Sequence, residues 1–483
     1  MSKGEFQFCR KTESPVLGGL GRRDFLYRFG HGLGGIALAS LLDQNGAMAA
    51  APTKSLGENP LTPKRGHHAA KAKACIFLFM SGAPSQMDTF DPKPKLSEYH
   101  GRAVHRVYGS LEKRIYVGSP YKFARHGKCG MEISEIFPHL ATCADDLAVV
   151  RSLHTSAQSH TTATFFMNTG AFIPGSPSLG AWLLYGLGTE NQDLPAYVVL
   201  PDKRGVFGGA INWANGYLPA SYQGTQLNSV GTPIVDLAPP AGVTRSQQRA
   251  NLDLLRDLND SSLGPDNPNL DLIARMRNYE QAFRMQTAVP EALGIDSEPR
   301  ETQELYGLDD KITESVGRKC LMARRLVERG VRFVQIYVDG WDSHDKIASE
   351  HRRRGYETDK PIAGLLKDLK RRGLLDETLV VWGGEFGRTA DNSMLFFRTD
   401  PGRDHNKSAM VMWLAGGGIK GGTVVGETNE LGTKAAENVY HTYDVHSTIL
   451  RQMGLDDMKL TYYHAGRFKR LTDLGGRLIK EIV

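Results

Sequence analysis

Short apolar runs recur along the chain, and the stretches between them have the apolar spacing of helices. Several runs are almost continuously apolar, which is typical of strands buried on both faces of a parallel or mixed sheet. The intervening segments include residues 362–369, whose apolar positions repeat at helical spacing, and Lys319–Glu328, which ends just before Gly330. The pattern predicts an α/β fold with strands at Ala74–Met80, Leu147–Leu153, Ala196–Leu200, Arg332–Val338, Thr378–Trp382 and Ala409–Ala415.

Residues 203–300 interrupt this alternation. A section rich in Gly, Asn and Ser leads into helical patterns at Leu252–Leu258 and Leu270–Arg284. We interpret the segment as a loop and helix insertion in one α/β domain that covers residues 71–483. A chain of 483 residues is long enough for one large enzyme domain or for two ordinary ones.

The N-terminal segment has the features of an export signal. The pair Arg22–Arg23 is followed by Phe-Leu, by a mildly apolar, Gly-rich run at Leu33–Leu42 and by the small residues of Ala47–Ala49. These features resemble a twin-arginine signal peptide at 1–49, and the run is too short for a stable membrane span. We therefore expect the twin-arginine export machinery as a partner, a periplasmic or extracellular location, and a linker at 50–70. A disordered basic tail is the alternative.

Composition excludes several classes of protein. Apolar residues make up 40% and charged residues 23%, which is ordinary for a globular domain and excludes collagen, coiled coil, full-length disorder and a polytopic membrane protein. The net charge is +6, but residues 1–49 hold six basic and four acidic residues, which leaves about +4 for the rest. This excess is too small to indicate a nucleic-acid partner.

Sequence motifs exclude several kinds of site. The five cysteines form no C-x-x-C, so a cysteine-based zinc or thioredoxin-like site is not expected, and whether Cys129 and Cys143 pair stays open. Gly416–Gly421 matches a dinucleotide-binding pattern, but the strand-like Thr423–Val425 follows instead of a helix, so we interpret it as a hairpin turn. Phosphate-loop, zincin and nucleophile-elbow motifs are absent. The basic run His351–Arg354 is interpreted as solvated surface.

Polar clusters follow the predicted strands, where ligands bind in open α/β sheets. Each cluster brings carboxylate or imidazole groups, a mixture that suits Zn, Mn or Fe better than Ca or Mg. Asp and His near strand ends also cap helices or bind loop backbone, and that alternative stays open for each cluster alone. Asp339 and Asp345 are the expected bystanders. The clusters lie at Ser81–Asp91, His154–Thr162, Asp339–Asp345, Gly383–Thr389 and Gly402–Asn406.

The order of these clusters resembles the alkaline phosphatase and sulfatase superfamily. The set is most similar to its exported sulfatase-like branch called domain of unknown function 1501, over about residues 75–475. This resemblance implies an alkaline-phosphatase-like three-layer α/β sandwich with a largely parallel central sheet and a loop and helix insertion. The stretches that carry it are Phe79–Asp88, Ile133–His139, Arg151–His154, Ser159–His160, Asn168–Gly170, Pro177–Trp182, Tyr185–Gly188, Gly340–His344, Gly384–Thr389, Gly402–His405 and His441–Leu450.

The resemblance also implies a metal site with one or two divalent ions, most simply Zn, with Mn or Fe as alternatives. Superfamily members use carboxylates and histidines after successive strands. Glu385 followed by Phe386 departs from the usual Asp-His pair. The matching positions are Asp88, Asp342, His344, Glu385, Asp404 and His405.

At the nucleophile position the sequence departs from the superfamily. The position about ten residues before Thr169–Gly170 holds His160 instead of the Ser, Thr or Cys of the superfamily. An imidazole can serve there as a nucleophile or as a metal ligand, but it does not replace a hydroxyl without altering the chemistry. Ser159 or Thr161 is the substitute hydroxyl. The helix N-terminus expected there favours phosphate or sulfate, which Arg388 would clamp.

These expectations give one main hypothesis and two rivals. The main hypothesis is an exported metal-dependent hydrolase acting on small-molecule or polysaccharide phosphate or sulfate esters. The rivals are a non-catalytic binding or envelope protein that has lost the nucleophile, and a phosphoryl transferase or mutase of the same fold. The Cys-x-Pro-x-Arg pattern that sulfatases convert to formylglycine is absent, which disfavours an ordinary sulfatase. Asp444 and His446 either line the site or cap the helix predicted at Val445–Met453, and capping is the preferred interpretation.

Overall fold

The computed structural model describes residues 59–104, 113–235, 237–261, 270–393 and 400–483. The predicted signal peptide at 1–49 and the first part of the predicted linker lie outside the described residues. The later part of that linker, residues 59–70, hydrogen-bonds to the domain, since the Lys64 amide donates to the Leu187 carbonyl at 2.8 Å.

A nine-stranded sheet forms the centre of the described domain, in the order β14-β5-β13-β9-β1-β8-β6-β7 with β17 beside β5. Strand β13 is antiparallel to β5 and β9, and the other neighbours run parallel, so the sheet is largely parallel as expected. The strands are β1 (Ala74–Met80), β5 (Leu147–His154), β6 (Tyr197–Leu200), β7 (Thr225–Gln226), β8 (Phe333–Val338), β9 (Thr378–Gly383), β13 (Met410–Ala415), β14 (Thr423–Val425) and β17 (Tyr440–His441).

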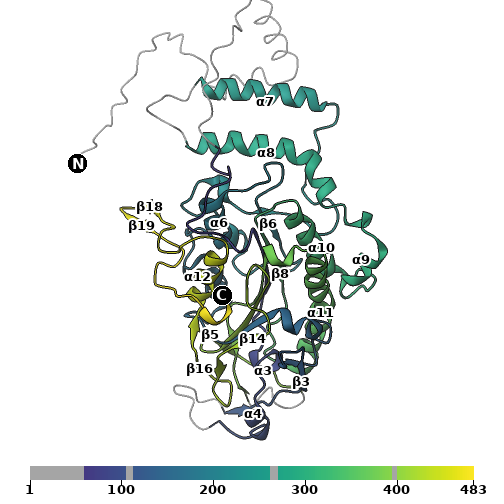
Figure 1. The fold of residues 1–483 in the computed structure, drawn as a ribbon, viewed down its shortest axis with the longest axis vertical. Helices are drawn as coiled ribbons and strands as arrows, with labels where there is room; N and C mark the ends of the chain where they lie inside the picture. The colour runs from purple at the N-terminus through teal and green to yellow at the C-terminus, as the bar shows by residue number, and fades with distance from the viewer. Residues whose placement is uncertain (1–58, 105–112, 236, 262–269, 394–399) are drawn as a thin grey trace, which may run out of the picture. The chain divides into compact units, whose positions relative to one another are not determined.

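Both faces of the sheet are covered, because side chains of a strand alternate between the two faces. Along β1, Ile76 and Leu78 enter one apolar core with α10 (Glu314–Glu328) and α11 (Ile347–Arg371). The intervening Phe77 enters a second core with α6 (Leu179–Leu187) and α12 (Thr442–Gln452). Figure 1 shows these helix pairs on opposite sides of the strands, which confirms the three-layer sandwich.

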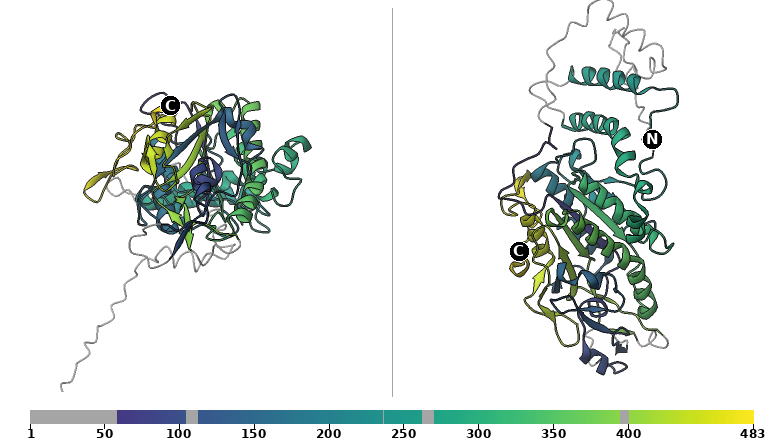
Figure 2. Two further views of the ribbon diagram at one scale, coloured as in Figure 1. Left: turned by 90° about the horizontal axis from the view of Figure 1, so that it is seen from below. Right: turned by 45° about the vertical axis from the view of Figure 1, so that its right-hand side comes forward.

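The segment 203–300 contains an edge strand and a helical hairpin. Strand β7 extends the main sheet next to β6, whereas α7 (Arg245–Asp260) and α8 (Leu270–Ala292) lie side by side in Figures 1 and 2. A capping box between Thr244 and Gln247 starts α7, and none of its residues is buried.

Shorter elements connect and border these layers. They position the loops at the carboxyl ends of the strands. No helix among the described residues is long and apolar enough to cross a membrane. The helices are α3 (Gln86–Thr89), α4 (Pro94–Glu98), α5 (His160–Thr169) and α9 (Arg300–Leu305), and the paired short strands are β2 (Arg114–Tyr116) with β11 (Asp391–Ser393), β3 (Phe123–His126) with β4 (Met131–Ser134), β10 (Gly387–Arg388) with β12 (His405–Asn406), β15 (Glu427–Thr428) with β16 (Ala435–Glu437), and β18 (Tyr462–His464) with β19 (Arg467–Lys469).

Two interpretations of local sequence were wrong. The Gly-rich turn at 416–421 does not close a hairpin, because β13 and β14 pair with opposite edges of β5 instead of with each other. The basic run at His351–Arg354 is not all solvated: His351 and Arg354 are 0% and 3% exposed, because helical spacing turns them inward on α11.

The described cysteines are all free. Cys129 is exposed and Cys143 is buried, so these two do not form a disulfide in the structure.

The buried His351 gives the protein a predicted loss of stability at acid pH. Its Nε2 accepts from the Ser85 amide and its Nδ1 lies at the Ser343 hydroxyl, both at 3.1 Å, so the ring is held neutral. Burial lowers the pKa of His351 to about 3, whereas the unfolded chain titrates near its ordinary value. Above about pH 6.5 the ring is neutral in both the folded and the unfolded chain, so the stability of the fold with neutral His351 is fully present. As pH falls from there towards 3, only the unfolded chain binds the proton, and the free energy of unfolding falls by up to about 1.4 kcal/mol per pH unit.

Chemical denaturation of the wild type and His351→Gln across this pH range measures the effect. We expect the variant to be less stable at neutral pH and to have the shallower pH dependence. The exposed His67→Gln variant serves as the control and should keep the wild-type slope. Equal slopes for wild type and His351→Gln would contradict the prediction.

Candidate metal centre

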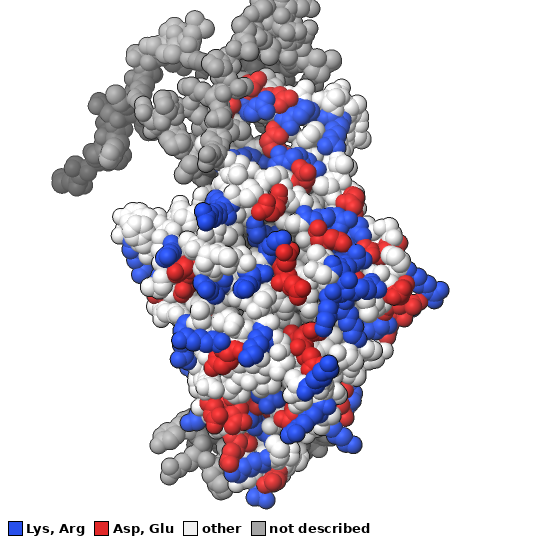
Figure 3. All heavy atoms as spheres, viewed as in Figure 1, with Lys and Arg blue, Asp and Glu red and all other residues white. Residues whose placement is uncertain are grey.

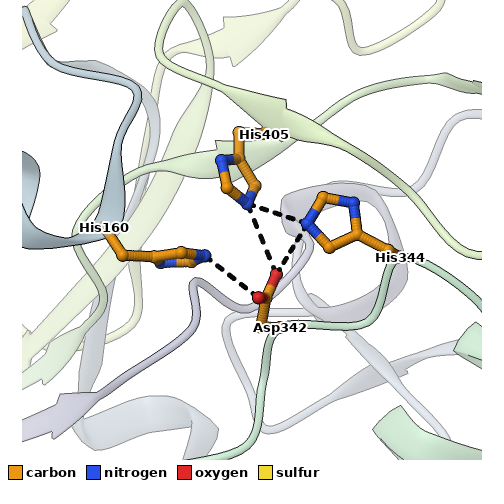
Figure 4. A group of neighbouring side chains, drawn as sticks. All are labelled: His160, Asp342, His344 and His405. Atoms are coloured by element: carbon orange, nitrogen blue, oxygen red, sulfur yellow. Dashed lines mark hydrogen bonds and ion pairs between the residues drawn. The ribbon is translucent and has the colours of Figure 1, made fainter. Parts of the chain in front are cut away.

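Four side chains meet beyond the carboxyl ends of β5 and β8. His160 is the first residue of α5, which follows β5, whereas Asp342 and His344 lie in the loop after β8. His405 comes from β12, just before β13. One potential ligand atom from each residue lies within 4.8 Å of the others, so the group could hold a metal ion (Figure 4).

The carboxylate of Asp342 is the centre of the group. Its Oδ2 lies 3.2 Å from His160 Nε2, and its Oδ1 lies 3.1 Å from His344 Nε2 and 3.4 Å from His405 Nε2. The Nε2 atoms of His344 and His405 are 2.9 Å apart. All three imidazoles thus direct the same ring nitrogen towards one carboxylate (Figure 4).

The opposite ring nitrogens are held by acceptors. His160 Nδ1 lies 2.5 Å from Glu385 Oε1, and His344 Nδ1 lies 2.8 Å from Asp404 Oδ1. The Nδ1 of His405 lies 2.9 Å from the carbonyl of Gln158. Since each acceptor requires a proton on Nδ1, the neutral rings present a lone pair at Nε2, as metal-binding histidines do.

The charges of the group favour protonated His160 and His344 opposite an ionised carboxylate, since hydrogen bonds to the carboxylates raise the pKa of both rings against the effect of burial. Burial opposes ionisation of Asp342, but hydrogen bonds from the three histidines outweigh it and hold its pKa well below the usual range. Hydrogen bonds to Asp342 and Asp404 raise the pKa of His344 to about 9. A metal ion that binds Nε2 must displace such protons, so binding weakens at low pH.

Three of the predicted ligands lie outside this group of four. Asp88 is fully buried on α3 and pairs with Arg403, Oδ2 to Nε at 2.6 Å. Asp404 accepts from His344 and also forms an ion pair with Arg114 at 2.5 Å. Glu385 is fully buried and accepts from the Gly82 amide at 2.9 Å as well as from His160.

Arg388 is fully buried behind the group. Its Nη2 lies 2.6 Å from Asp342 Oδ1, and its Nε donates to the Ala83 carbonyl at 3.0 Å. The Arg388 guanidinium also donates hydrogen bonds to the carbonyls of Gly82 and Arg403. This guanidinium therefore orients the carboxylate of Asp342 from the protein side.

Ser159 and the start of α5 face outward beside the group. Ser159 is exposed, precedes the helix and makes no side-chain capping hydrogen bond. The amides of the first helical turn have no partner within a helix, which makes this end suited to an anion.

An aromatic side chain that no sequence pattern indicated covers His160. The ring of Phe207 stacks on the imidazole at 4.5 Å between centroids, with an interplanar angle of 11°. Asn212 fixes this loop by donating to the carbonyls of Phe207 and Gly209, at 2.8 and 3.0 Å. Asn212 is in turn held by Asn168, 3.2 Å away, so a buried amide network positions the cover.

Asp444 and His446 lie apart from the group of four. Asp444 Oδ2 accepts from the His441 amide at 2.7 Å in the capping box of α12, as expected. His446 is buried and its Nε2 lies 2.7 Å from the carbonyl of Met167 in α5. The side chain therefore joins α12 to α5 and does not cap α12.

The carboxylate behind His160 gives a testable effect on metal binding. Glu385→Gln keeps the shape of the side chain but removes the charge that holds Nδ1 protonated. We expect divalent-metal affinity to fall by about 10–100-fold, as outer partners of ligating histidines typically contribute. Titration calorimetry at fixed pH measures it. The half-exposed Glu377→Gln, paired with Lys73, is the control and should bind as the wild type does. Unchanged affinity in Glu385→Gln would contradict this role.

The fold and the site define a three-layer α/β protein with a candidate metal centre at the carboxyl ends of its strands. The chain belongs to the family described as "Protein of unknown function (DUF1501)", whose model matches residues 72–483. Membership of domain of unknown function 1501, predicted from the motifs, is thus confirmed, whereas the exported and sulfatase-like character of that branch stays a prediction. No curated protein matches the chain.

Solved structures with a similar chain path come from the alkaline phosphatase and sulfatase superfamily at low identity. PsFucS1 sulfatase from Pseudoalteromonas sp. is 13% identical, with a TM-score of 0.34 over 87% of this chain and 70% of its own. The lipoteichoic acid synthase LtaP from Listeria monocytogenes is 9% identical, with a TM-score of 0.37 over 82% and 77%. Alkaline phosphatase from the Antarctic bacterium TAB5 is 10% identical, with a TM-score of 0.33 over 79% and 98%.

Proposed function

We propose that this protein is an exported metal-dependent hydrolase of phosphate or sulfate esters. The observation that carries the proposal is the convergence of three imidazole Nε2 atoms on Asp342 while acceptors hold each Nδ1. Three nitrogens and one carboxylate oxygen suit Zn, with Mn or Fe as the next candidates.

We propose one ion at this centre. His160, Asp342, His344 and His405 would hold it. Their side chains are between 11% and 43% exposed, so both an ion and a substrate can reach them. The other predicted ligands, Asp88, Glu385 and Asp404, are engaged by Arg403, His160 and His344, respectively, and act by holding their partners in place.

The neighbouring groups support an anionic substrate. A bound divalent ion supplies Lewis acidity and lowers the pKa of water. The first turn of α5 offers amides and a helix dipole to a phosphate or sulfate group. Ser159 places an exposed hydroxyl beside that turn, where it can donate to the ester or attack it.

We assign His160 to ligation and not to nucleophilic attack. Its Nδ1 is hydrogen-bonded to Glu385 and its Nε2 faces Asp342, so neither nitrogen is directed at a substrate placed over the helix N-terminus. We assign Arg388 to orienting Asp342, because its guanidinium is fully buried and cannot clamp a substrate.

The location and the substrate class are also proposals. The Arg22–Arg23 pair and the short apolar run after it support twin-arginine export to the periplasm or beyond. We propose small-molecule or polysaccharide esters as the substrates.

An activity screen with defined metals tests the proposed function. Metal-free protein is reloaded with Zn, Mn or Fe(II) and assayed with p-nitrophenyl phosphate, bis-p-nitrophenyl phosphate and p-nitrophenyl sulfate. We expect metal-dependent hydrolysis of at least one ester, and no hydrolysis by Asp342→Asn. Metal binding without turnover of any ester would favour the non-catalytic rival, and phosphoryl transfer to an added alcohol in preference to water would favour the transferase.

A further inference from the structure

The side chain of His160 is the most enclosed imidazole of the candidate metal centre. It is 11% exposed, whereas the side chains of His405 and His344 are 21% and 43% exposed. Two phenyl rings contact the imidazole of His160. Phe207 stacks on it, and the buried Phe386 packs against it with ring centroids 4.9 Å apart. This ligand is therefore surrounded by aromatic carbon, while the other two histidines are more open to solvent.

The stack with Phe207 restricts the direction in which His160 can point. The torsion about the Cβ–Cγ bond of a histidine has broad minima, so contacts with neighbouring groups must define the plane of the ring. The Phe207 ring lies 4.5 Å from the imidazole and within 11° of parallel to it. Rotation about that bond would drive the edge of the imidazole into the phenyl ring. The stack therefore fixes the direction of Nε2, which faces Asp342.

The chain next to Phe207 lies directly against α5. Gly208 has a φ angle of 82°, in the left-handed region that glycine adopts without strain. A Cβ atom at this position would overlap the ring of Phe165, a buried residue of α5. Glycine thus allows the loop to approach the helix closely enough for Phe207 to cover His160, the first residue of that helix.

A series of buried side-chain amides connects this loop to the central sheet. Asn212 donates to the Phe207 carbonyl and accepts from Asn168 on α5. Asn168 accepts in turn from Gln335 on β8, which accepts from the Tyr197 hydroxyl at 2.7 Å. Every side-chain nitrogen and oxygen of the three amides has a partner. A buried polar network that is fully satisfied is rigid and specifies one arrangement.

The same amides join the elements that supply the ligands. Asn168 lies on α5, which begins with His160. Gln335 lies on β8, which leads into the loop that contains Asp342. The position of Phe207 is therefore tied to the backbone of two ligand-bearing elements and not to the loop alone.

Long-range charge does not explain how a cation would be held at this centre. The chain has a net charge of +6, which does not attract a divalent cation. On the face drawn in Figure 3, basic and acidic side chains are interspersed. Retention of an ion must therefore come from the local geometry of its ligands, and features that fix a ligand acquire functional weight.

We propose that Phe207 is a positioning residue of the metal centre, held in place by Gly208 and Asn212. By fixing the imidazole plane it keeps Nε2 of His160 directed at the ion, and so it sets the coordination geometry and the affinity of the site. This inference rests on the metal centre of the proposed function.

Titration of the metal-free protein with Co(II) tests the proposal, because the visible absorption of bound Co(II) reports its coordination geometry. Phe207→Ala should bind Co(II) and Zn about tenfold more weakly, as for the loss of an outer partner of a ligating histidine, and should alter the Co(II) spectrum. Gly208→Ala keeps the phenyl ring but displaces it, and Asn212→Leu frees the loop, so both should reproduce this change. Phe207→Tyr preserves the stack and should retain the wild-type spectrum and affinity.

Tyr217→Ala is the matched control. Tyr217 is half-buried like Phe207 and stacks on the imidazole of His464 with nearly the same geometry, 4.7 Å and 14°, but this pair lies outside the group of four. The variant should bind Co(II) as the wild type does, and melting temperatures establish that each variant is folded.

The outcomes separate this role from the proposed function. A wild type that binds no metal would overturn the metal centre and the role of Phe207 together. A wild type that binds metal, with the same spectrum and affinity in Phe207→Ala, would overturn the role of Phe207 alone. An equal loss in Tyr217→Ala would also overturn it, because loosened packing anywhere would then weaken the site.

Discussion

Asp342→Asn should abolish the metal centre. The carboxylate lies between the Nε2 atoms of all three histidines and is the only negative group in the set of four. Asn keeps the shape but loses the charge and one oxygen acceptor. Loss of a hydrogen-bond partner of a ligand typically costs up to about 100-fold in metal affinity, so loss of the central carboxylate itself should cost more than that. Esterase activity should fall with it. Equilibrium dialysis against a metal buffer measures the affinity.

A neighbouring residue in the same loop supplies the control. Asp345→Asn changes an exposed carboxylate three residues away that lies outside the group of four. It should keep both metal and activity. Wild-type metal content in Asp342→Asn would contradict ligation by Asp342, and an equal loss in Asp345→Asn would show that loop charge and not ligation is responsible.

Asp88→Ala should cost stability and leave the metal in place. Asp88 and Arg403 are both fully buried, and the carboxylate also accepts from the Ser85 hydroxyl at 2.5 Å. Burial opposes ionisation of Asp88, but its pKa is lowered because the Arg403 guanidinium outweighs that effect. Removing the carboxylate leaves an uncompensated buried cation, which typically costs about 3–5 kcal/mol. Denaturant unfolding measures the loss.

The metal content of the folded Asp88→Ala protein decides between two roles. We expect wild-type stoichiometry, because Asp88 lies outside the group of four. Asp193→Asn is the stability control, since its side chain is 64% exposed and such changes stay within about 0.5 kcal/mol. Lost metal with unchanged stability would make Asp88 a ligand, as the resemblance to the superfamily had suggested.

The sheet could be predicted because it is buried on both faces. Strands such as β1 and β9 are then continuously apolar, and each predicted run overlaps a strand whose ends agree with it to within one residue. Strand β7 was not predicted, since its two residues are too few to carry a pattern. The inward turn of His351 was in principle visible from the helical spacing of α11, but the basic residues around it dominated the interpretation.

The location of the site could be predicted more readily than its internal contacts. Asp342, His344 and His405 follow or precede strands, and the sheet brings them together with His160. By contrast, Glu385 pairs with a histidine 225 residues away, and Asp88 pairs with Arg403 across 315 residues. Sequence spacing contains no information about such long-range partners. Carboxylates that hold another side chain in place could therefore not be distinguished from carboxylates that would bind a metal.

Metal content tests the central claim most directly. Elemental mass spectrometry on purified wild type and on His344→Ala/His405→Ala gives the stoichiometry without any assumption about the substrate. The account predicts about one equivalent of Zn, Mn or Fe in the wild type and almost none in the folded double variant, because two of the three nitrogen ligands are gone. A correctly folded wild type that takes up none of these metals, or a double variant that retains its ion, would contradict the metal centre.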